Sequence, residues 1–135
     1  MSADVWYVDS SALVKRVIEE PESEALERWL DGKKRLVACE LVRVEVVRAV
    51  RASDPAAVPR ARQAIRTLTL LRLDDDLYEA AADLDPPLLR SLDAIHLAAA
   101  IAVGGDLAGV VTYDARMADG ACAVNLTVQS PGRKT

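Results

Sequence analysis

The sequence predicts an α/β fold, because short apolar runs alternate with segments of helical periodicity along its whole length. No long linker, low-complexity tract or internal repeat interrupts this alternation. At 135 residues the chain is expected to form a single domain, residues 1–135, that removes roughly two-thirds of its unfolded surface from water. The expected architecture is a parallel sheet flanked by helices, and residues 130–135 are expected to form a frayed tail.

The predicted strands are apolar runs bounded by turn residues or by helix caps. The first run, Val5-Trp6-Tyr7-Val8, is the clearest, and a parallel sheet of four to five strands is expected in all. The runs span residues 5–8, 36–38, 70–73, 109–112 and 126–128.

The predicted helices fill the intervals between these strands, and each stops at a recognisable breaker or cap. They span residues 10 or 11 to 18, 22–30, 40–51, 57–67, 74 or 75 to 84, 92–103 and 115–120. The signals that end or separate them are Pro21, Gly32, the run 53–55, the prolines 86 and 87, and the glycines 104 and 105.

Composition and charge restrict the class of protein. Although 51% of the residues are hydrophobic, no apolar run reaches the roughly 18 residues of a membrane span. Asp4 stands where a signal peptide needs positive charge, so a cytoplasmic protein is expected. The net charge of −4 argues against broad, salt-driven nucleic-acid binding, but acids that hold a metal would lower the net charge of a nuclease too. Cys39 and Cys122 form no C-x-x-C pattern, and both are expected to be buried small hydrophobes.

Four acidic residues stand at positions poorly suited to a purely structural acid. Asp9 ends the first apolar run, Glu45 interrupts a valine-rich helix, Asp93 opens the apolar helix and Asp114 follows the fourth strand. Because ligands in open parallel sheets bind beyond the carboxyl ends of the strands, one pocket there is expected to collect all four. Carboxylates among apolar neighbours repel one another and resist desolvation unless a cation lies between them. The pattern therefore indicates a divalent-metal site.

Each acid also has an ordinary structural interpretation. Asp9 is a plausible N-cap for the helix that follows it, Asp114 a turn residue or cap, and Asp93 a cap that accepts from the backbone of Ile95 or His96. Glu45 has a possible ion-pair partner in Arg48 or Arg16. Capping and catalysis are compatible, and the case for function rests on the four acids recurring together.

The motifs around these acids resemble those of PIN-domain ribonucleases, specifically the VapC toxins of bacterial toxin–antitoxin pairs. The matching segments are residues 7–15, Glu45 in its valine-rich helix, residues 92–100 and residues 111–116, in order along nearly the whole chain. The resemblance implies a PIN-like three-layer fold and a metal-dependent endoribonuclease that cleaves structured RNA, such as transfer or ribosomal RNA. It also implies a homodimer that a VapB-type antitoxin neutralises.

Residue roles follow from that resemblance. Mg²⁺, with Mn²⁺ as a substitute, prefers hard oxygen ligands and keeps several waters, so Asp9 and Asp93 are expected as direct ligands, with Asp114 completing the shell. Glu45 is expected to orient or deprotonate the attacking water. One ion or two are both compatible with the sequence. Ser10 and Thr112 are expected to hydrogen-bond the carboxylates or a phosphate.

Other features carry less weight. Arg116 is the best candidate for an RNA phosphate contact, since it lies beside Asp114. His96, the only histidine, is expected to be a buried, hydrogen-bonded structural residue. The sequence lacks the second acid of a haloacid-dehalogenase phosphatase and the Gly-rich turn of a nucleotide-binding protein. The alternative of another class is a catalytically silent PIN-fold module that binds RNA or protein.

Overall fold

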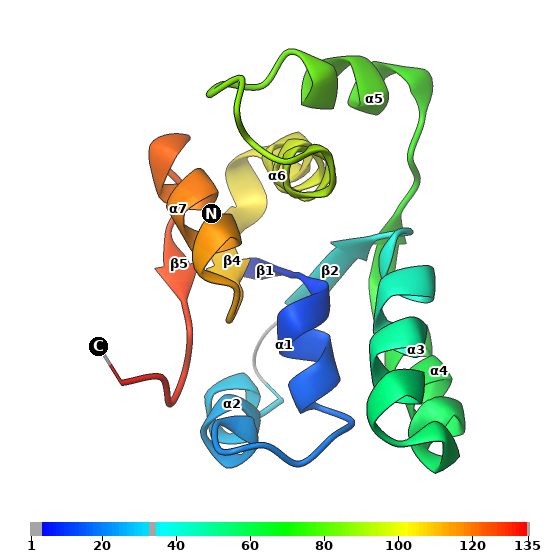
Figure 1. The fold of residues 1–135 in the computed structure, drawn as a ribbon. Helices are drawn as coiled ribbons and strands as arrows, with labels where there is room; N and C mark the ends of the chain where they lie inside the picture. The colour runs from blue at the N-terminus through cyan, green and yellow to red at the C-terminus, as the bar shows by residue number, and fades with distance from the viewer. Residues whose placement is uncertain (1–3, 33–34, 135) are drawn as a thin grey trace.

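A five-stranded, all-parallel sheet forms the centre of the computed structural model, which describes residues 4–32 and 35–134 (Figure 1). The spatial order of the strands is β3-β2-β1-β4-β5. Their bounds are β1 (Val5–Val8), β2 (Arg35–Cys39), β3 (Thr69–Leu71), β4 (Leu107–Val111) and β5 (Val128–Gln129). The predicted α/β class and the parallel sheet are therefore confirmed.

The helices occupy the predicted intervals, with shifted ends. They are α1 (Ser10–Lys15), α2 (Ser23–Leu30), α3 (Val42–Ser53), α4 (Val58–Arg66), α5 (Asp75–Ala82), α6 (Ser91–Val103) and α7 (Ala115–Ala123), with short 3₁₀ turns η1 (Pro55–Ala57) and η2 (Gly104–Asp106).

Two of the predicted helix ends are wrong for identifiable reasons. Helix α1 stops before Arg16, whose N–H donates to the carbonyls of Leu13 and Val14 and so tightens the last turn. Helix α7 continues past Gly120, where a Cβ would lie 2.9 Å from the side chain of Leu97. Gly120 therefore permits close helix packing instead of ending the helix.

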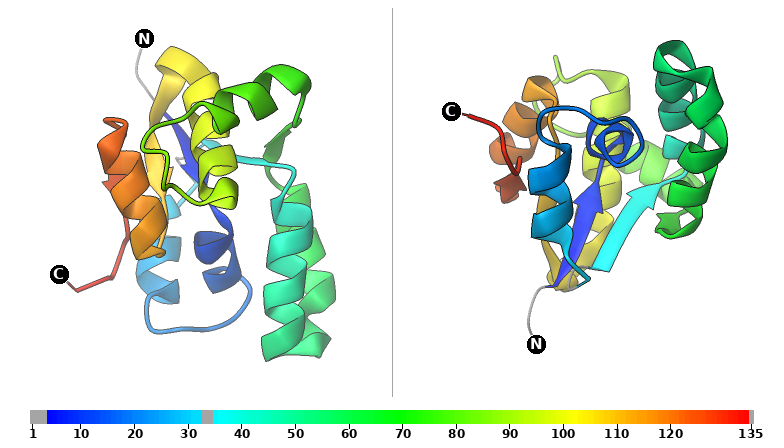
Figure 2. Two further views of the ribbon diagram at one scale, coloured as in Figure 1. Left: turned by 45° about the horizontal axis from the view of Figure 1, so that its top comes forward. Right: turned by 90° about the horizontal axis from the view of Figure 1, so that it is seen from below.

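Helices cover both faces of the sheet, and each face has its own hydrophobic cluster. Val8, Ala38 and Val111 point to the face covered by α1 to α4, whereas Tyr7 and Val110 point to the face covered by α5 to α7. This alternation is the two-residue period of a strand that is buried on both sides. Figure 2 shows α3 and α4 lying side by side along one edge of the molecule.

The chain reverses its direction of travel across the sheet at β1. It moves outward from β1 to β2 and β3, crosses back through α5 and α6, and enters β4 on the other side of β1. Right-handed crossovers in opposite directions place their helices on opposite faces and leave a crevice between the carboxyl ends of the two diverging strands. Here those strands are β1 and β4.

One cysteine departs from its expected environment. Cys39 is buried at the end of β2, as predicted, but Cys122 is exposed, so the prediction for Cys122 is wrong. In α7 the buried residues are Met117, Gly120 and Ala121, and Cys122 follows them on the outer side of the helix. Both thiols are free.

The C-terminal segment, which was expected to fray, contacts the β4–α7 connection. Ser130 Oγ donates to the carbonyl of Thr112 at 2.5 Å, and Arg133 Nη2 donates to the carbonyl of Tyr113 at 2.7 Å. The Tyr113 hydroxyl donates to the carbonyl of Pro131, also at 2.7 Å. Thr135 lies outside the described residues.

Within the described part of the chain, no helix has the length and apolar character needed to span a membrane.

Gly109 lies where β4 approaches its neighbours most closely. A Cβ at this position would lie 2.5 Å from the backbone oxygen of Thr127 and 2.7 Å from the ring of Trp6. Trp6 is itself fixed by an edge-to-face contact with Trp29, at 4.7 Å between ring centroids. A side chain at position 109 would therefore force the backbone of residue 127 or the Trp6 ring to shift, so glycine fits best.

We predict that Gly109→Ala lowers the free energy of unfolding by about 2 kcal/mol, because the added methyl group forces the backbone of residue 127 outward. Urea titration followed by circular dichroism measures this change. Gly105→Ala is the matched control, since a Cβ there meets nothing within 4 Å. Equal stability of the two variants would contradict the proposed close packing.

Candidate active site at the carboxyl ends of β1 and β4

Asp9 lies directly after β1, at the point where β1 and β4 diverge. Its side chain is 5% exposed and accepts hydrogen bonds from Ser11 Oγ at 2.6 Å, from the backbone N–H of Ala12 at 3.2 Å and from Thr112 Oγ1. Burial nevertheless raises the pKa of Asp9 above its ordinary value, against the lowering effect of these bonds. Asp9 therefore does cap α1, and it is also a carboxylate for which the buried charge is costly.

Thr112 joins the ends of the two diverging strands. It follows β4 immediately and is fully buried, and its hydroxyl bonds the Asp9 carboxylate and accepts from the N–H of Asp114 at 3.1 Å. One hydroxyl thus fixes the relative positions of Asp9 and the loop that carries Asp114. Thr112 thus makes the kind of contact expected of it, whereas Ser11, whose hydroxyl also accepts from the N–H of Tyr113 at 2.8 Å, was not predicted. The two serines that directly follow Asp9 in the sequence were the signal from which the role of Ser11 could have been predicted.

Glu45 reaches the site from the first turn of α3. Its Oε1 atom accepts from Ser10 Oγ at 2.6 Å and lies 2.7 Å from His96 Nε2. The structural alternative, an ion pair with Arg48 or Arg16, is therefore wrong. Arg16 lies at the other end of α1 from Ser10 and pairs instead with Glu27 at 2.8 Å.

His96 connects Glu45 to the core beneath the site. Its ring is 4% exposed, with Nδ1 at 2.6 Å from the Tyr7 hydroxyl and 3.7 Å from Cys39 Sγ. Burial alone would lower the pKa of His96, but the interactions with Cys39 and Glu45 outweigh it and raise the pKa to about 10. Burial likewise works to raise the pKa of Glu45, and the bonds from His96 and Ser10 lower it below its ordinary value. The expected buried, hydrogen-bonded histidine is present, and it holds Glu45 ionised.

Asp93 occupies the first turn of α6 and is half-buried. Its pKa is raised by burial and then by the charge of Asp114, despite the opposing charges of His96, Arg90 and Arg116. Among the described residues no hydrogen bond reaches its carboxylate, so the interpretation of Asp93 as a helix cap is wrong. The reason is its position: α6 starts at Ser91, which puts Asp93 inside the helix and not at the preceding capping residue.

Asp114 is exposed and caps α7. Its Oδ1 atom accepts from the backbone N–H of Arg116 at 2.8 Å and of Met117 at 3.4 Å. Both bonds use Oδ1, so neither occupies Oδ2. The predicted capping role is therefore correct, and it leaves one carboxylate oxygen outside the capping contact.

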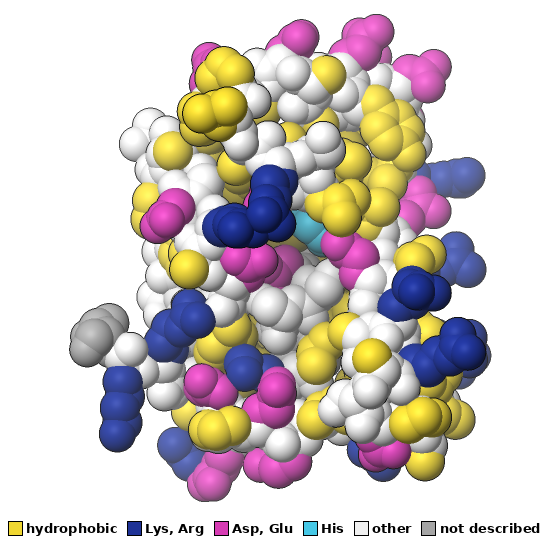
Figure 3. All heavy atoms as spheres, viewed as in Figure 1, with side chains coloured by type: hydrophobic (Ala, Val, Ile, Leu, Met, Phe, Trp, Pro, Cys, Tyr) yellow, Lys and Arg dark blue, Asp and Glu magenta, His cyan; other side chains and the backbone are white. Residues whose placement is uncertain are grey.

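The acids form an electrostatic group without forming a closed cage. Figure 3 shows acidic side chains around a hollow in the middle of one face, with the histidine beside them and basic side chains next to them. The charge of Asp114 acts on Asp93, and His96 interacts with Glu45, Asp9 and Asp93. Within residues 4–32 and 35–134, however, no three or more His, Cys, Asp or Glu side chains stand in an arrangement that would hold a metal ion by themselves.

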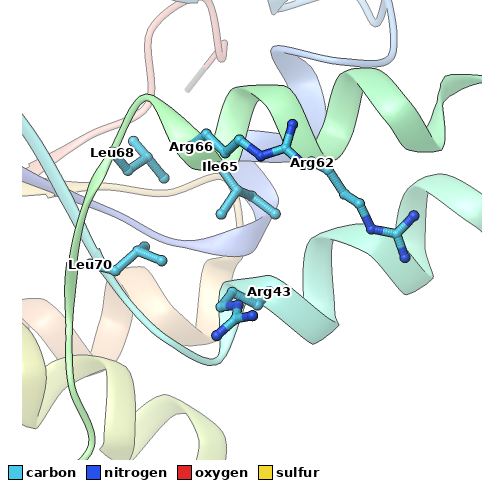
Figure 4. A pocket seen from close by; sticks show the side chains of 6 residues that line it. All are labelled: Arg43, Arg62, Ile65, Arg66, Leu68 and Leu70. Carbon is cyan, nitrogen blue, oxygen red and sulfur yellow. The ribbon is translucent and has the colours of Figure 1, made fainter.

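Two of the surface cavities are lined by more than one arginine. One of about 480 Å³ adjoins the acids and is lined in part by Arg90, Asp93 and Arg116. The other, of about 490 Å³, lies at the β3 edge, where Arg62, Ile65 and Arg66 project from α4 and Arg43 from the start of α3 (Figure 4). None of the four acids lines the second cavity, so the chemistry of the site belongs with the first.

Known proteins resemble this chain over almost its full length. A family profile described as "PIN domain" matches residues 6–121. "Ribonuclease VapC46" of Mycobacterium tuberculosis is 44% identical over 125 residues, which are 93% of this chain and 96% of that protein. "Ribonuclease VapC35" of the same species is 40% identical over 131 residues, 94% of this chain and 97% of that protein.

Solved structures share the fold at low sequence identity. The crystal structure of Mycobacterium tuberculosis VapC20, described as a sarcin-ricin loop cleaving toxin, aligns with a TM-score of 0.71 at 17% identity and covers 90% of this chain and 96% of that one. VapBC2 from Rickettsia felis, bound to a DNA fragment from their promoter, aligns with a TM-score of 0.64 at 13% identity, over 93% of this chain and 97% of that chain. The PIN profile and the near-full-length matches at 40–44% identity show that the chain belongs to the PIN-domain family, within its VapC ribonucleases.

Proposed function

We propose that this chain is a divalent-metal-dependent endoribonuclease that cleaves structured RNA, such as transfer or ribosomal RNA, through Asp9, Glu45, Asp93 and Asp114. The observation that carries the proposal is the electrostatic crowding of Asp93 and Asp114 beside the buried Asp9, at the crevice between β1 and β4. A carboxylate whose pKa is raised by a neighbouring carboxylate, as that of Asp93 is, is characteristic of sites that bind a ligand of opposite charge.

The donor set suits Mg²⁺ or Mn²⁺. Carboxylate oxygens are hard ligands, and Mg²⁺ keeps several waters and needs only one or two protein carboxylates, so a site without a three-acid cage is sufficient. Asp9 and Asp93 would be the direct ligands of the ion, with Asp114 completing its shell. When bound, the ion neutralises phosphate charge and makes a coordinated water more acidic.

Glu45 is suited to orienting the attacking water. Its pKa is lowered by His96 and Ser10, which makes it a weak base but a well-fixed hydrogen-bond acceptor. Of the two roles expected from the sequence, orientation is therefore the better supported. Ser10 serves Glu45, and Thr112 serves Asp9, as positioning residues. Arg116 supplies positive charge beside the acids for an RNA phosphate.

The proposal includes a VapB-type antitoxin that neutralises the enzyme, a homodimeric state and a cytoplasmic location. The named complex of the Rickettsia felis relative supports the antitoxin. The homodimer and the location stay predictions, which sedimentation and fractionation of cells measure directly.

We predict that Asp93→Asn lowers the rate of RNA cleavage in Mg²⁺ about 100-fold or more, because the site loses a charge that stabilises the bound ion. The same change should leave the melting temperature in EDTA unchanged or raised. The pKa of Asp93 is raised in the folded protein, so its ionised form opposes folding at neutral pH.

Asp106→Asn is the matched control, since Asp106 is exposed and directly precedes β4, at the amino end of that strand and therefore away from the acids. Full activity of Asp93→Asn would contradict the proposed site. Wild-type protein that cleaves no RNA in Mg²⁺ or Mn²⁺ would favour the catalytically silent module.

We predict that stability falls as pH rises from 6.5 to about 10. His96 has a folded-state pKa of about 10 against an ordinary value of 6.5, so its interactions with Cys39 and Glu45 stabilise the fold fully below pH 6.5 and are lost as His96 deprotonates. Between pH 6.5 and about 10 the free energy of unfolding should fall in both proteins, but by about 2 kcal/mol less in Glu45→Gln than in the wild type. Parallel curves of unfolding free energy against pH for the two proteins would refute the charged pair.

A further inference from the structure

The cavity beside Asp93 opens directly onto the acids. Asp93 and Arg116 belong both to its wall and to the electrostatic group of the site. Its volume of about 480 Å³ falls within the range of small-ligand pockets. Whatever occupies it therefore lies next to the phosphate that the site would hold.

The walls of this cavity combine apolar surface with positive charge. Leu88 and Leu89 lie on the connection between α5 and α6, and Ala123 ends α7 on another side. Leu88 is 97% exposed, so its side chain is accessible to a ligand in this cavity. Arg90 and Arg116 flank the same space. Apolar side chains can contact the face of an unstacked nucleobase, and guanidinium groups can stack on the base or bind its phosphate.

Asp119 adds a hydrogen-bond acceptor to this wall. It is exposed and lies one turn after Arg116 on α7. A carboxylate accepts from the N–H groups on the edge of a base, and two adjacent N–H donors, as on guanine, fit both of its oxygens. Adenine, cytosine and uracil each present a single donor group on that edge and would leave one oxygen of Asp119 unpaired.

We propose that this cavity holds the base of a nucleotide adjacent to the scissile phosphate and makes cleavage base-selective. This inference rests on the proposed ribonuclease function. Leu88 and Leu89 contact the face of the base, Arg90 and Arg116 contact the flanking phosphates, and Asp119 accepts from the N–H edge, which favours guanine. Structured RNA presents such bases in loops and bulges, where they are unstacked.

The experiment compares cleavage patterns. Purified wild-type protein is incubated with total RNA and Mg²⁺, the new RNA ends are sequenced, and short oligonucleotides with each of the four bases at the flanking positions are then cleaved. The wild type is expected to prefer guanine at one flanking position. Asp119→Asn, which replaces an acceptor oxygen with a donor, is expected to reduce that preference about tenfold or more. Ala123→Leu is expected to slow cleavage of the preferred oligonucleotide about tenfold by filling the cavity.

Ala52→Leu and Asp106→Asn are the controls, since both positions are exposed and lie away from the cavity, at the end of α3 and before β4. If Asp119→Asn keeps the preference for guanine, the inference is overturned while the proposed function stays intact. If Ala123→Leu fails to fold, Asp119→Asn alone decides the test. A changed oligomeric state in Ala123→Leu, with the preference of Asp119→Asn unaltered, would assign the cavity to a subunit contact and also overturn the inference. Absence of cleavage by the wild type would overturn the proposed function together with it.

Discussion

The hydrogen bond between Thr112 and the buried Asp9 carboxylate links the ends of β1 and β4. The divergence of these two strands at the point where the chain reverses its travel creates the crevice, and this bond fixes its two sides. Asp9 also bonds the first turn of α1, and Thr112 also bonds the backbone of Asp114. Displacing either side chain would therefore move helix α1 and the loop before α7 relative to each other, and with that loop Asp114.

The buried polar groups beneath the crevice form a second layer of constraint. Tyr7, His96 and Glu45 connect the middle of β1 to α6 and α3 through bonds of 2.6 and 2.7 Å. Across the described residues, no buried side-chain nitrogen or oxygen lacks a hydrogen-bond partner. A network satisfied in this way is rigid, because breaking any bond would leave an unpaired group in a low-dielectric environment. The acids above it are thus held despite the unfavourable environment of Asp9 and Asp93.

Much of this arrangement could be predicted from the sequence, because strand runs, breakers and the acids that follow strands are local signals. The apolar run before Asp9 and the one before Asp114 were enough to place both acids at one edge of a parallel sheet. The partner of Glu45 could not be predicted in the same way. His96 lies 51 residues further along the chain, and only the packing of α6 against the sheet brings its ring to α3. The end of α7 was missed for a similar reason, since Gly120 stops a helix by local propensity but here accommodates the side chain of Leu97.

The contacts of residues 130–133 with Thr112 and Tyr113 have a consequence for the thermodynamics of ligand binding. Connections between strands and helices are usually mobile, and a ligand that orders them loses affinity through the entropy of that ordering. Here Ser130 and Arg133 brace the backbone that leads to Asp114 before any ligand arrives. The carboxylate of Asp114 is accordingly pre-organised, and cation or phosphate binding at this loop should carry only a small conformational penalty.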